Sequence, residues 1–298
     1  MKGGIPMRIK VLKNTLIVLS IIMLTSSISY CNELDISAKS AILIDAESGR
    51  VLYSINSQEK MPMASTTKIM TALVAIENGN MNDMVKIKRE SVGVEGSSIY
   101  LFEGEEISKE DLLYGLMLRS GNDAAIAIAN HIGGNTENFI NIMNNRSKEI
   151  GALNTNFVNP HGLDDENHYT TTYDLALITK EALKINEFKD IVGTKTWVAN
   201  RLKNNYFYNK NKTVYTKETG RCLVSSATRK GMQLIAVVLN DSNWFNDCYE
   251  LLDYGFENYN PYILYDKGQF IRNLPVKKGK KLEVPVITEE ICAIPLND

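Results

Sequence analysis

The chain has 298 residues, of which 44% are hydrophobic and 23% charged, as expected for a globular protein with a large core. Its formal net charge of -2 gives no electrostatic basis for binding nucleic acid. The four cysteines include no Cys-x-x-Cys pair, and the three histidines form no His-Glu-x-x-His array, so we expect neither a metal nor a cofactor.

The first 31 residues have the composition of an export signal. A basic stretch is followed by an apolar run at 15–24 (TLIVLSIIML), which is too short to span a bilayer comfortably. Ser27 and Ser29 (SIS) offer an Ala-x-Ala-like cleavage site. We therefore predict a signal peptide over 1–31 and an exported protein. An uncleaved signal that associates with the membrane is the alternative.

After this signal, the runs 40–45 (SAILID) and 51–55 (VLYSI) flank a turn and predict a β-hairpin. The next segment, 64–77 (ASTTKIMTALVAIE), has apolar residues at helical spacing and predicts a largely buried helix. Ser65 lies at its start, and Lys68 follows one turn later on the same face.

A lysine amine beside a serine hydroxyl can accept the hydroxyl proton, provided that the amine is neutral. Burial would lower its pKa enough for this, and the helix dipole would favour an anion developing at Ser65. However, a Ser-x-x-Lys match occurs by chance about once in a chain of this length. A helix cap at Ser65 is therefore the alternative, and a catalytic role requires further partners.

Such partners follow at the junction of two predicted helices. One helix begins at Ser108 and continues through Leu118, and an apolar helix follows from Ala124. Between them, Ser120 and Asn122 flank Gly121, which can take backbone angles that other residues avoid. A hydroxyl and an amide here suit proton relay and substrate binding. Ordinary helix capping is the alternative.

The rest of the chain predicts an α+β fold in which an antiparallel sheet, including the N-terminal hairpin, is flanked by helices. The predicted segments are helices at 136–150, 172–184 and 244–259, a turn-rich loop at 156–165, and strands at 206–208, 212–216, 222–227, 232–239 and, as a terminal pair, within 271–287. We expect His161 and His168 to be structural. Cys222 and Cys248 could pair or remain free thiols.

Three segments resemble the low-molecular-weight penicillin-binding proteins, which are serine D-alanyl-D-alanine carboxypeptidases. They are 63–71 (MASTTKIMT), 118–125 (LRSGNDAA) and 157–163 (FVNPHGL). The likeness covers roughly 35 to 260, and the tail resembles the opening of that family's C-terminal β-rich domain. It implies a β-lactamase/DD-peptidase-like domain at 34–260 and a short, truncated β segment at 262–298.

The resemblance also implies roles. Ser65 attacks the carbonyl between two D-alanines, Lys68 is the general base, and Ser120 passes the proton to the leaving amine. Asn122 binds the substrate amide, and backbone N–H groups, one of them at Ser65, form the oxyanion hole. The implied partners are a peptidoglycan stem peptide ending in D-Ala-D-Ala and, as covalent inhibitors, β-lactams.

The family's third motif, Lys-Thr-Gly, is altered in this chain. The best match is Lys212-Thr213-Val214, and the family's following pattern continues at 215–222. Either valine replaces the glycine, or a segment that held the motif is missing. Lys212 and Thr213 could still bind the terminal carboxylate. The side chain of Val214 would obstruct a substrate lying along the strand.

Three functions follow from these residues. The first is a carboxypeptidase that trims the terminal D-alanine from stem peptides. The second is an impaired or inactive relative that binds peptidoglycan without turnover, as the altered third motif suggests. The third is a serine β-lactamase, which shares the first two motifs. No Glu-x-x-Leu-Asn string, which such enzymes often use for deacylation, occurs in the chain.

Overall fold

The computed structural model describes residues 34–199, 206–209, 215–216, 220–289 and 291–297. The signal predicted for 1–31 lies outside these residues. From Ile36 to Asp298 the chain forms one compact unit, so the predicted division near residue 260 stays a prediction. No helix in the described part of the chain has both the length and the apolar character needed to cross a membrane.

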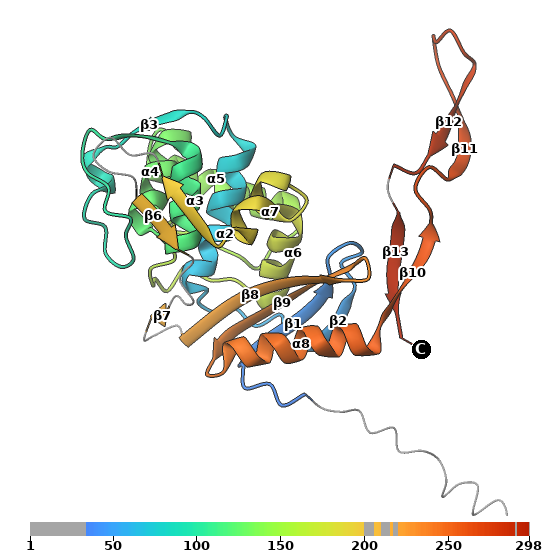
Figure 1. Cartoon of the computed structure of the whole chain (residues 1–298), viewed down its shortest axis with the longest axis horizontal. Helices are drawn as coiled ribbons and strands as arrows, with labels where there is room; N and C mark the ends of the chain where they lie inside the picture. Colours follow the sequence, from blue (N-terminus) through green and yellow to red (C-terminus); the bar gives the residue numbers. More distant parts are fainter. Residues whose placement is uncertain (1–33, 200–205, 210–214, 217–219, 290, 298) are drawn as a thin grey trace, which may run out of the picture. The chain divides into compact units, whose positions relative to one another are not determined.

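The centre of the fold is a five-stranded antiparallel sheet (Figure 1), in which the N-terminal hairpin pairs with later strands, as predicted. Ile42 and Ile44 point to one face and join the main hydrophobic core. Leu43 points to the opposite face. In order across the sheet the strands are β2 (Val51–Ile55), β1 (Ser40–Asp45), β9 (Met232–Asp241), β8 (Gly220–Arg229) and β7 (Tyr215–Thr216).

Helices cover both faces of the sheet. Helix α8 (Trp244–Asn258) packs against the face of Leu43, and a Cβ at Gly255 would lie 2.8 Å from the Cδ2 atom of Leu43. The other face carries a helical layer around α2 (Lys68–Glu77). The surrounding helices are α3 (Lys109–Arg119), α4 (Asn122–Gly133), α5 (Thr136–Ile150), α6 (Thr172–Ala182) and α7 (Asn186–Gly193).

Two basic side chains fix α2 within this layer. The buried Lys109 amine donates to the carbonyls of Ala75 and Asn78, both at 3.0 Å, and so satisfies groups at the C-terminal end of α2. Arg146 pairs with Glu77 of α2 at 2.7 Å and with Glu181 of α6 at 2.9 Å. The helix is therefore held at its end and along its side.

Most predicted elements are confirmed, although the helical segments differ in three places. The segment 64–77 begins as a 3₁₀ turn, η1 (Ala64–Thr67), before α2 starts. The helix predicted at 172–184 ends at Ala182, and its cap is Thr171. Helix α7 is missing from the sequence prediction, because only Phe188 and Ile191 are buried in it.

Outside the main sheet, the strands form two-stranded ribbons. The chain ends in two of them: β10 (Asn260–Tyr265) pairs with β13 (Cys292–Leu296), and β11 (Phe270–Pro275) pairs with β12 (Glu283–Ile287). The remaining ribbons pair β3 (Met84–Lys86) with β4 (Glu106–Ser108), and β5 (Thr196–Ala199) with β6 (Tyr206–Asn209).

Candidate active site

The 3₁₀ turn η1 presents Ser65 directly ahead of α2. No side-chain hydrogen bond caps either η1 or α2, so the capping alternative for Ser65 finds no support. The Nζ atom of Lys68 lies 3.0 Å from Ser65 Oγ, within hydrogen-bond distance. Ala64, just before the serine, has a φ of 47°, a left-handed backbone conformation that residues other than glycine rarely adopt.

Burial sets the protonation of Lys68, which is only 2% exposed. Desolvation lowers the pKa of its amine to about 7, although the carboxylate of Asp123 acts in the opposite direction. Two further oxygens lie within reach of the amine: Asn122 Oδ1 at 2.8 Å and the His161 carbonyl at 2.6 Å. Both can only accept, so a neutral amine that donates to them directs its lone pair at the Ser65 hydroxyl.

The junction between α3 and α4 carries Ser120 and Asn122 and brings Asn122 to Lys68. Asn122 holds Lys68 through its oxygen and donates from Nδ2 to the Glu95 carbonyl at 2.6 Å. Ser120 is buried, and its Oγ atom has no hydrogen-bond partner among the described residues. A buried hydroxyl without a partner costs free energy, which is consistent with a functional role for Ser120.

Gly121 does not use the backbone freedom that glycine allows. Its φ is -63°, and the left-handed residue is Ser120, with a φ of 56°. Glycine is needed at 121 for space: a Cβ there would lie 3.0 Å from Asp123 Oδ1 and 3.1 Å from Ile99 Cγ2.

Asp123 anchors the loop that passes over this junction. Its buried carboxylate accepts from Ser98 Oγ at 2.6 Å, from the Ile99 amide at 3.0 Å and from the Leu101 amide at 3.1 Å. Within the same loop, Gly96 lets the backbone approach Asn122, because a Cβ there would lie 2.6 Å from Asn122 Nδ2. The asparagine is thus fixed from both sides.

The predicted loop at 156–165 packs against the nucleophile turn. A Cβ at Gly162 would lie 1.9 Å from the Ala64 carbonyl oxygen, so only glycine fits. Thr71 of α2 donates to the Pro160 carbonyl at 2.6 Å. This contact also brings the His161 carbonyl to Lys68.

Both loop histidines have structural contacts, in keeping with their predicted role. His168 Nδ1 accepts from the Val158 amide at 3.1 Å, so its proton is on Nε2, which lies 2.7 Å from Thr67 Oγ1. Thr67 in turn donates to the Ala64 carbonyl. Burial lowers the pKa of His161 and of His168 to about 4, so both rings are neutral at pH 7.

The sheet side of the turn is formed by β7 and the start of β8, which contact η1. Cys222 of β8 is a buried free thiol, and Cys248 of α8 is another, so they do not form a disulfide. The predicted carboxylate-binding residues Lys212 and Thr213, together with Val214, lie outside the described residues. Only Tyr215–Thr216 of that strand is described, paired with Gly220 and Arg221.

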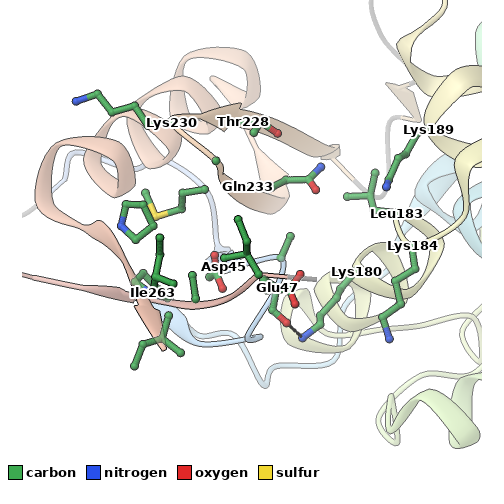
Figure 2. Close-up of a pocket in the computed structure, with 18 of the residues that line it drawn as sticks. Asp45, Glu47, Lys180, Leu183, Lys184, Lys189, Thr228, Lys230, Gln233 and Ile263 are labelled. Atoms are coloured by element: carbon green, nitrogen blue, oxygen red, sulfur yellow. Dashed lines mark hydrogen bonds between the residues drawn. The ribbon is translucent and has the colours of Figure 1, made fainter. Parts of the chain in front are cut away.

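A separate cavity of about 700 Å³ lies away from these groups (Figure 2). Asp45 and Glu47 lie in its wall together with four lysines. These are Lys180 of α6, Lys184 of the loop after it, Lys189 of α7 and Lys230 of the β8–β9 turn. Lys180 is already engaged, because it donates to the Glu47 carbonyl at 2.8 Å. Ser65, Lys68, Ser120 and Asn122 are not in its wall, so it is distinct from the candidate active site.

Comparisons with known proteins agree with this geometry. The family model for D-alanyl-D-alanine carboxypeptidases (peptidase family S11) matches residues 27–243. The chain is 38% identical to D-alanyl-D-alanine carboxypeptidase DacF of Bacillus subtilis, covering 88% of this chain and 73% of that one. It is 34% identical to DacA of Haemophilus influenzae, covering 84% and 69%.

Among solved structures, penicillin-binding protein 5 from Haemophilus influenzae superposes with a TM-score of 0.75 at 30% identity, covering 89% of this chain and 83% of that one. The fold and the site together define a serine peptidase of the DD-peptidase type. The chain belongs to the D-alanyl-D-alanine carboxypeptidase family, and it is a hydrolase of that class. Nothing in these comparisons supports the impaired alternative.

Proposed function

We propose that the chain removes the terminal D-alanine from peptidoglycan stem peptides through an acyl-enzyme on Ser65. This proposal rests on the buried amine of Lys68. Its Nζ atom lies 3.0 Å from Ser65 Oγ, and its pKa is lowered to about 7. A large share of this amine is neutral at pH 7, which a general base requires.

Acylation begins with a proton transfer from Ser65 to Lys68. The Ser65 hydroxyl gives its proton to Lys68 as Oγ bonds to the carbonyl carbon of the penultimate D-alanine. Backbone N–H groups, including that of Ser65, stabilise the resulting oxyanion. The C–N bond breaks, and Ser120 passes the proton from Lys68 to the departing D-alanine amine. Water, deprotonated by Lys68, releases the shortened peptide and restores the serine.

Substrate binding divides between the two sides of the site. Asn122, fixed by Lys68 and Glu95, would bond the peptide amide of the substrate. Lys212 and Thr213 are proposed from the sequence alone to bind the terminal carboxylate. β-Lactams would acylate Ser65 as substrate mimics, because their ring carbonyl occupies the same position.

We further propose that residues 1–31 export the chain, so that it acts at the outer face of the cytoplasmic membrane or in the cell wall. Carboxypeptidases of this family act on peptidoglycan, which agrees with export. N-terminal sequencing of the secreted protein would find a start near residue 32. A start at Met1, with all protein in washed membranes, would instead indicate an uncleaved anchor.

The deciding test combines labelling with product analysis. Wild type should react with a fluorescent penicillin and release D-alanine from an N-acyl-Lys-D-Ala-D-Ala peptide. Ser65→Ala should do neither, whereas the control Ser54→Ala, at an exposed serine, should match wild type. Labelling that persists in Ser65→Ala would overturn the assignment. Penicillin turnover without D-alanine release would favour a β-lactamase.

A further inference from the structure

The turn between β11 and β12 gathers four lysines in five residues: Lys277, Lys278, Lys280 and Lys281, around Gly279. All four are exposed. No salt bridge joins any of them to an acidic residue in the described part of the chain. Because the whole chain has a formal net charge of -2, this turn is a local concentration of positive charge.

The backbone holds these lysines in a closed loop. The Val276 amide donates to the Leu282 carbonyl at 2.9 Å, and the loop lies at the end of the β11–β12 ribbon (Figure 1). Lys278 has a φ of 62°, and Gly279 packs close to Val276. The four lysine side chains therefore extend from a compact turn.

Apolar side chains adjoin the charges. Leu282 is 87% exposed, more than any other large exposed hydrophobic residue in the described part of the chain. Leu274 and Val284 are cross-strand partners behind the loop, and both are exposed. Twelve of the eighteen exposed large hydrophobic side chains in the described residues lie between Tyr262 and Leu296.

We propose that this turn, residues 276–282, docks the protein onto an anionic phospholipid surface. Lysine clusters bind such surfaces electrostatically, and a neighbouring leucine can enter the headgroup region. Charge complementarity selects the partner: four unpaired cations beside exposed aliphatic groups match negative headgroups above hydrocarbon. This inference is independent of the catalytic roles proposed above.

The test measures binding of the full chain to sedimented vesicles. Phosphatidylcholine vesicles containing about a third phosphatidylglycerol should bind wild type. Replacing all four lysines of the turn by glutamine should weaken this binding about 100-fold or more, since each lysine near an anionic surface contributes about 1 kcal/mol. Residues 1–33 are common to both proteins, so the difference reports on the turn.

The matched control replaces Lys180, Lys184, Lys189 and Lys230, which line the cavity of Figure 2, by glutamine. It removes the same charge and should leave vesicle binding within a few-fold of wild type. Equal losses in both variants would show a net-charge effect and overturn the proposal. Far-UV circular dichroism of each variant verifies that it is folded.

Two further measurements identify the surface. Leu282→Trp should give a blue-shifted emission component with anionic vesicles and none with pure phosphatidylcholine. Wild type should also prefer these vesicles over soluble poly(glycerol phosphate) at equal phosphate concentration. Preference for the soluble polymer, or an emission spectrum unchanged by anionic vesicles, would contradict docking to a bilayer.

Discussion

The two sides of the candidate active site are built from different kinds of contact. On the helical side, Ser65, Lys68 and Asn122 are joined by hydrogen bonds that also reach the loop at 159–163. On the sheet side, the described part of the edge strand β7, Tyr215–Thr216, pairs through its backbone with Gly220 and Arg221. The two sides can therefore be tested separately, the helical side through Lys68 and the sheet side through the proposed third motif at 212–214.

The largest expected effect comes from disabling the helical side. Lys68→Ala removes the base. It should lower the acylation rate by on the order of 10⁴-fold, as when one residue is removed from a set of catalytic residues that act together. The measurement is the rate of fluorescent penicillin labelling, with far-UV circular dichroism as a check on folding. A folded variant that labels at the wild-type rate would end the Ser–Lys hypothesis.

The sheet side can be tested by Val214→Gly. If Lys212-Thr213 occupies the third motif, removing the valine side chain should raise acylation by up to about 100-fold, because the rate depends steeply on carbonyl placement. Acylation constants of the two proteins are measured side by side. No gain would instead support a missing segment, and labelling absent from both proteins would support a non-catalytic chain.

The pH dependence should report on the helical side alone. The pKa of Lys68 is lowered to about 7, so the neutral base becomes scarce below that pH. Acylation should therefore rise about tenfold per pH unit below 7 and level off above it. A pH-rate profile from 5 to 9 checks this expectation. An inflection near 10 would show that the lysine is not desolvated during the reaction.

The smallest expected effect is on stability, at the hydrogen bonds that hold the turn carrying Ser65. Thr67→Val removes the hydroxyl that links His168 to the Ala64 carbonyl and leaves a buried ring N–H without its partner. The free energy of unfolding should fall by about 2 kcal/mol, measured by urea denaturation. The control Thr194→Val, at an exposed hydroxyl, should change it by less than about 0.5 kcal/mol. Equal losses of unfolding free energy in the two variants would contradict a stabilising role for the Thr67 hydroxyl.

Local patterns in the sequence predict much of the fold. The hairpin, α3, α5 and α8 follow from periodicity and turn residues, and Ser65, Lys68, Ser120 and Asn122 follow from motif spacing. What the sequence cannot predict is contact between distant segments. The His161 carbonyl reaches Lys68, and Gly162 fits only because it touches Ala64. At the junction the left-handed residue is Ser120, and Gly121 is needed for space, neither of which the local pattern predicts.

The free thiols have a consequence for how the protein matures. Burial raises the pKa of Cys222 to about 11 and that of Cys248 to about 12, so neither forms an appreciable amount of thiolate at neutral pH. Thiol–disulfide exchange proceeds through the thiolate, so both sulfurs are poor partners for oxidants. The native fold thus contains no covalent cross-link between Cys222 and Cys248, and a reducing agent should leave the structure around these two residues unchanged.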